Sequence, residues 1–129
     1  MDAQQELFTH LKLNIEALGY AVYDSELPPE DTPYPFVYLG DFEQDDKEIK
    51  NGTYGTVSPM IHVWHNNTNQ RGTVSEMLYN IKQVCRRMKN TPSYAWTVLK
   101  LKSRIITDTT TKAPLLHGVI YGGEWFFFS

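Results

Sequence analysis

The sequence has a single cysteine, Cys85, among its 129 residues. One cysteine cannot form an intramolecular disulfide, so the disulfide-rich secreted scaffolds are excluded. No apolar run approaches the roughly 18 residues that indicate a membrane-spanning helix. The first residues are polar and acidic, where a signal peptide needs a basic start and an apolar run. We therefore expect a soluble protein that is made in the cytoplasm and has no membrane partner.

An excess of positive charge is also missing. The chain has 12 Lys and Arg against 15 Asp and Glu, which gives a formal net charge of -3. Proteins that grip nucleic acid phosphates usually carry a basic surplus, so we expect no sequence-specific nucleic acid binding. Neither a Gly-x-x-x-x-Gly-Lys phosphate loop nor a Gly-x-Ser-x-Gly elbow occurs. The sequence therefore predicts neither an enzyme nor a cofactor site.

The length fits one domain, residues 1–129, with one core. Two segments, 2–18 and 73–88, have apolar residues at helical spacing. Each begins with the spacing of a capping box, namely Asp2 with Gln5 and Thr73 with Glu76. Gly19 occupies the position at which a left-handed residue ends a helix. Cys85 lies on the apolar arc of the second segment, which predicts a buried thiol with a raised pKa and not a nucleophile.

Strand-forming residues fill much of the remaining chain. The expected strands are residues 21–23, 36–39, 53–65, 94–106 and 115–128. Pro59 indicates an edge position or a bulge, and Gly122-Gly123 indicates a bulge. Leu99, Leu101 and Ile105 are expected to share one face of their strand. Because strands come in adjacent runs, the order α, β, β, β, α, β, β predicts an α+β fold. We expect a mainly antiparallel, twisted sheet with both amphipathic helices packed on one face.

Five acidic residues crowd the segment that follows residue 39: Asp41, Glu43, Asp45, Asp46 and Glu48. The next turn signal, Asn51-Gly52, is typical of a hairpin, so we expect an extended acidic β-hairpin arm. A charge run usually remains in water. The alternative is an arm that docks on a neighbouring subunit, where the basic row Lys100, Lys102 and Arg104 offers a surface of opposite charge.

The histidines form no recognisable metal motif. His62 and His65 are three residues apart on an expected strand, so their side chains point to opposite faces and cannot share one ion. His10 and His117 have no acidic or thiol partner nearby in the sequence. We expect no metal site.

Four consecutive aromatic residues, Trp125, Phe126, Phe127 and Phe128, lie near the end of the chain. On a strand, such a run places large rings on both faces. One face can pack against the helices. The other is either covered by the chain itself or exposed as a partner site, and both interpretations stay open.

Three blocks occur in a characteristic order: Gly19-Tyr20-Ala21-Val22-Tyr23-Asp24-Ser25-Glu26-Leu27-Pro28 with Tyr34-Pro35-Phe36-Val37-Tyr38-Leu39-Gly40; Val63-Trp64-His65 with Gly72 and Val74-Ser75-Glu76; and His117-Gly118-Val119-Ile120-Tyr121. Together they resemble a tail-completion family of long-tailed bacteriophages. The blocks span most of the chain.

The resemblance implies structural work without catalytic residues. Members of that family are tail terminators, or tail-to-head joining proteins, which form a ring, commonly a hexamer, on the head-proximal end of the tail tube. The implied partners are other copies of the chain, the tail-tube protein and a head-completion or connector protein. The implied location is the virion neck, after assembly in the host cytoplasm. Two alternatives remain: a head-completion (stopper) protein, and a small ligand-binding domain or enzyme with a pocket around Trp64.

Overall fold

The computed structural model describes residues 1–24 and 28–129. Within them the chain forms α1 (Ala3–Glu16), β1 (Val22–Tyr23), β2 (Phe36–Ile49), β3 (Gly52–His65), α2 (Arg71–Arg87), β4 (Ala95–Asp108) and β5 (Leu115–Phe128). The predicted order of helices and strands is confirmed. Ser25, Glu26 and Leu27 of the first family block lie outside the described residues.

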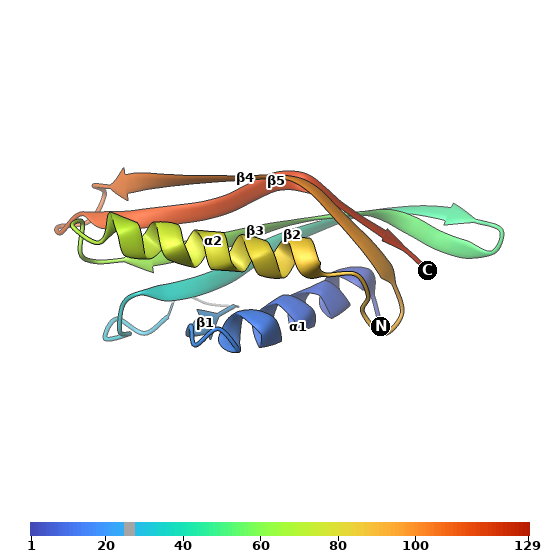
Figure 1. Cartoon of the computed structure of the whole chain (residues 1–129), viewed down its shortest axis with the longest axis horizontal. Helices are drawn as coiled ribbons and strands as arrows, with labels where there is room; N and C mark the ends of the chain where they lie inside the picture. The colour runs from blue at the N-terminus through green and yellow to red at the C-terminus, as the bar shows by residue number, and fades with distance from the viewer. Residues whose placement is uncertain (25–27) are drawn as a thin grey trace.

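The strands form one sheet in the order β1-β2-β3-β5-β4. β1 runs parallel to the start of β2, and all other neighbours are antiparallel. Figure 1 shows a long, twisted sheet whose β2–β3 hairpin extends past the ends of both helices. The predicted α+β class with a mainly antiparallel sheet is therefore confirmed.

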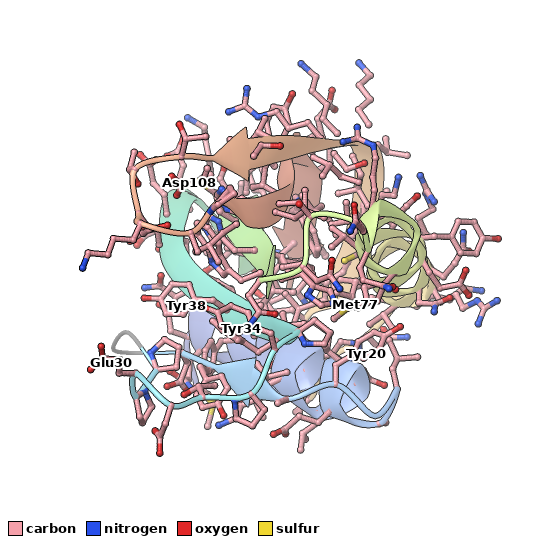
Figure 2. All side chains as sticks on the ribbon, turned by 90° about the vertical axis from the view of Figure 1, so that its left-hand side faces the viewer. Tyr20, Glu30, Tyr34, Tyr38, Met77 and Asp108 are labelled. Atoms are coloured by element: carbon pink, nitrogen blue, oxygen red, sulfur yellow. The ribbon has the colours of Figure 1, made fainter. Side chains whose placement is uncertain are left out.

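The core lies between the sheet and the two helices. Its fully buried helical residues include Leu7, Leu11 and Ile15 from α1 and Val74, Ile81 and Cys85 from α2. Gly118 of β5 lies so close to α2 that a Cβ there would be 2.8 Å from the Val74 side chain. We call the sheet face that packs on the helices the inner face and the opposite one the outer face. Figure 2 shows Tyr34 and Tyr38 on the side of β2 away from α2.

None of the helices in the described residues is long and apolar enough to cross a membrane.

Both helices begin differently from the prediction. Asp2 precedes α1 without capping it, because its carboxylate accepts a 2.9 Å hydrogen bond from the Gln44 amide of β2. α2 begins at Arg71, before Thr73, and the Thr73 hydroxyl donates to the Gln70 side chain at 2.7 Å. The predicted capping boxes are thus wrong, since tertiary and local partners take their polar groups. Gly19 has a φ of 94°, as its predicted place at the end of the first helix requires.

The hairpin turn is one residue earlier than predicted. Ile49 pairs with Gly52, so Lys50 and Asn51 form the turn and Gly52 already belongs to β3. A Cβ on Gly52 would lie 2.7 Å from the backbone oxygen of Ser129. The close approach of the C-terminus, and not the turn, is therefore what requires a glycine here.

Pro59 lies in a central strand, so the edge position is wrong and the bulge is confirmed. β3 has β2 on one side and β5 on the other. Its pairing with β2 is irregular between Gly40 and Glu43, and its pairing with β5 is irregular between Thr56 and Ile61. Proline has no N–H to donate to a ladder, so it fits where the regular pairing is interrupted.

A further irregularity, between β4 and β5, reverses the faces of β4. Lys100 has a φ of 57°, and opposite it Gly122 and Gly123 have φ values of 62° and 77°. Pairing runs from Leu99 with Glu124 to Leu101 with Gly122, which leaves Lys100 and Gly123 unpaired. Leu99 is consequently 48% exposed, so the prediction that it shares a face with Leu101 is wrong. The predicted interruption of β5 at the two glycines is confirmed, but the register is the same on both sides of it, so the predicted bulge is wrong.

Candidate interaction surfaces

The acidic segment lies along β2, whose far side carries no other strand beyond Tyr38 in the part of the chain that the structure describes. All five acidic residues of the segment are exposed: Asp41, Glu43, Asp45, Asp46 and Glu48. The sheet divides them between two faces. Asp46 accepts a hydrogen bond from the Gln44 amide on the inner face at 2.5 Å, while Glu43 and Asp45 alternate with these residues and point outward.

The basic row lies on β4, at the opposite edge of the sheet. Lys100 forms an ion pair with Glu124 of β5, with its Nζ 2.9 Å from the carboxylate. The Arg104 guanidinium carbon lies 5.3 Å from the centre of the Tyr121 ring, a distance that suits a cation–π contact. β3 and β5 separate this row from the acidic segment, so the two charged surfaces cannot meet within one chain.

The aromatic run divides between the core and the surface. Trp125 and Phe127 are 1% and 2% exposed, whereas Phe126 and Phe128 are 42% and 55% exposed. Phe127 packs edge-on against Tyr94, with 5.3 Å between ring centres. Trp125 and Phe127 therefore belong to the core, and the rings of Phe126 and Phe128 lie on the outer face.

The exposed rings continue onto β3. Phe128 is directly opposite Tyr54, which is itself 41% exposed, and Phe126 is opposite Thr56. These side chains form an apolar patch on the outer face near the C-terminus. Exposed aromatic rings next to one another are typical of a surface that contacts a partner.

A histidine pair on the outer face was not predicted. The Nδ1 of His62 and the Nε2 of His117 are 2.8 Å apart, and Trp64 stacks on His117 with 3.9 Å between ring centres. The signal was in the sequence, because both histidines have outward parity on their strands. The contact between the two histidines could be predicted only from the register of β3 and β5. This register pairs Trp64 with His117 and His62 with Val119.

Burial disfavours the charged form of both histidines. Burial, with the neighbouring His62 and Arg104 adding to it, lowers the pKa of His117 to about 4, against the opposing effect of Asp108. Burial also lowers the pKa of His62, against the opposing effect of Asp41. The His117 imidazole covers one face of the Trp64 ring, which lies at the centre of the alternative ligand pocket.

The other predicted positions can be placed as well. His65 does not face His62, because its Nδ1 accepts a 3.2 Å hydrogen bond from the Asn67 backbone in the loop after β3. Among the described residues, no three His, Cys, Asp or Glu side chains gather as a metal site would require. Cys85 is buried, and this burial raises the pKa of its thiol to about 12, which confirms the predicted core thiol.

We predict that His117 makes the stability of the protein dependent on pH. Between pH 6.5 and about 4 the folded chain binds fewer protons at His117 than the unfolded chain does. Stability is therefore full above pH 6.5 and falls as the pH drops toward 4, by about 2 kcal/mol for a half-buried group. Urea unfolding of the wild type and of His117→Gln across this range measures the effect, and the difference between the two should change with pH. A constant difference would contradict the lowered pKa.

Comparison with known proteins finds similarity to solved structures. No protein-family model matches the chain, and no curated protein matches it. The chain is similar to a solved structure described as the virion of a native gene transfer agent particle. The two are 17% identical, with a TM-score of 0.59 over 98% of this chain and 95% of that one. At this identity the likeness is one of fold, and it extends over nearly the whole of both chains.

Proposed function

We propose that this protein is a structural virion protein that caps the head-proximal end of a phage tail tube and joins the tail to the head connector. The observation that carries the proposal is the likeness of its fold, from end to end, to a chain of a virion particle. The ordered sequence blocks that resemble the tail-completion family support the same role independently. The proposed work is assembly and not catalysis.

The proposed assembly is a ring, commonly a hexamer in the family that the sequence resembles. A ring is built from head-to-tail contacts, in which two different surfaces of each copy meet and the rotation closes. An elongated sheet with an acidic edge on one side and a basic row on the other offers two such surfaces. The net charge of -3 also suits a ring through which DNA passes without being held by its phosphates.

The test is electron microscopy of virions from the parent phage or prophage with a stop codon in place of Gln5. We expect DNA-filled heads beside unjoined or overlong tails, and joined virions when the intact chain is supplied from a plasmid. Supplying the chain with the same stop codon is the matched control. Normal virions without the protein would overturn the proposal. Leaking or empty heads beside tails of normal length would favour the stopper role instead.

A further inference from the structure

We propose that copies of this chain join edge to edge, with the free edge of β2 in one copy paired to the free edge of β4 in the next. The partner is thus a second copy, and the sheet continues from subunit to subunit. This inference deepens the proposed ring and takes its biological setting from it.

Two strand edges are open in the described chain. β1 pairs with β2 only at Val37 and Tyr38, so among the described residues no strand pairs with the β2 edge from Leu39 onward. β4 pairs with β5 on one side. On its other side, a backbone hydrogen bond from Trp96 to Lys89 and a bridge at Ala95 cover only the start of the strand. Rows of unpaired backbone N–H and C=O groups are templates for another strand.

The topology gives such a contact the usual antiparallel geometry. β2 is antiparallel to β3, β3 to β5 and β5 to β4, so β2 and β4 of one copy point in opposite directions. A rotation about an axis that runs roughly along the strands preserves these directions in the next copy. β4 of one copy then meets β2 of its neighbour as an antiparallel pair.

The register also brings acidic residues of β2 close to basic residues of β4 in the neighbouring copy. One row crosses the sheet through Leu39, Ile61, Ile120 and Ser103, and another crosses it through Asp45, Thr56, Phe126 and Thr97. Between these rows, β2 carries Asp41 and Glu43 and β4 carries Lys100 and Lys102. Two copies that meet without a shift along the strands therefore place acids beside bases, which favours this register over shifted ones.

Charged residues and bulges on edge strands usually keep copies apart. Such protection works when the edges that meet carry the same charge. Here the two edges carry opposite charges, so each edge repels its own kind and attracts the other. This arrangement disfavours symmetric dimers and favours a head-to-tail contact, which is the kind that closes into rings.

The experiment traps the contact with a disulfide between two variants. Asp45→Cys and Thr97→Cys place thiols on the outer face in the same row, on the two edges. Cys85 is buried and the pKa of its thiol is raised to about 12, so this thiol should not be oxidised under mild conditions. A mixture of the two variants should give about tenfold more cross-linked dimer than Thr97→Cys mixed with Glu76→Cys, a control thiol exposed on α2. A chain carrying both edge cysteines should give a ladder of higher oligomers.

Charge variants test the register. Adding Lys102→Glu to the Thr97→Cys chain should lower the yield of dimer, and adding Asp41→Lys to the Asp45→Cys chain should restore it, because the unshifted register places Lys102 next to Asp41 of the neighbour. A mixed yield no higher than that of the control overturns the edge contact. The two proposals fail separately, because unjoined tails in the stop-codon phage would still support the virion role. A cross-linked ladder together with normal virions would support the edge contact alone.

Discussion

Phe127→Ala is expected to lower the free energy of unfolding by about 4 kcal/mol, because it removes a ring from a closed core and leaves a cavity. Phe127 is 2% exposed and contacts the rings of both Tyr94 and Trp96. For a domain of this size, the loss corresponds to a Tm lower by about 15 °C. Chemical denaturation followed by circular dichroism measures the change.

The matched control is the neighbouring ring. Phe126→Ala removes the same atoms from a side chain that is 42% exposed, and we expect a loss of about 1 kcal/mol or less. Equal losses at the two positions would mean that the outer face is as closed as the core. The pair of variants therefore distinguishes a strand covered on both sides from one with an exposed face.

The sequence predicted the elements well because their patterns are periodic. Leu7, Leu11 and Ile15 repeat at helical spacing, and Ile61 and Val63 alternate with outward residues, so burial of one face follows from period alone. The run of four aromatics divides between faces for the same reason. The alternation of residues along the strand could not predict which rings remain exposed. Their exposure depends on whether another element covers the outer face.

The predictions were wrong where the conformation or the contacts of a residue depend on another residue far away in the sequence. Asp2 does not cap α1 because Gln44, more than forty residues away, holds its carboxylate. Leu99 is exposed because Lys100 adopts a left-handed conformation opposite two glycines, which reverses the alternation of β4. The His62–His117 contact needs the register of β3 and β5. Each depends on pairing between strands or elements, which no local pattern in the chain encodes.

The same limit applies to the proposed contact between copies. The sequence separated acidic and basic segments and suggested that they meet across subunits. Only the sheet order shows that they lie on opposite edges, and only the register shows that Asp41 and Glu43 lie level with Lys100 and Lys102. Within one chain the two sets of charges are too far apart to meet, and the proposed contact would bring them together between copies.

Gly55→Ala is expected to lower the free energy of unfolding by about 3 kcal/mol and to loosen the hairpin that carries the acidic edge. A Cβ at Gly55 would lie only 2.0 Å from the backbone oxygen of Asp45 and 3.0 Å from the Phe127 ring. Backbone cannot move aside as a flexible side chain can, so β2 must separate from β3 at this row. Denaturation measures the global loss. Hydrogen exchange should show faster exchange of the amides around Asp45.

Gly72→Ala provides the control, because a Cβ at this helical position has nothing within 4 Å. Alanine favours the helix, so this variant should match or exceed the wild-type stability by about 0.5 kcal/mol. Wild-type stability of Gly55→Ala would contradict the close approach of β2 to β3. Since Asp45 lies on the proposed contact edge, loosening this row should also reduce the Asp45→Cys to Thr97→Cys cross-link. An unchanged cross-link in a loosened hairpin would show that the contact does not need the ordered β2 edge.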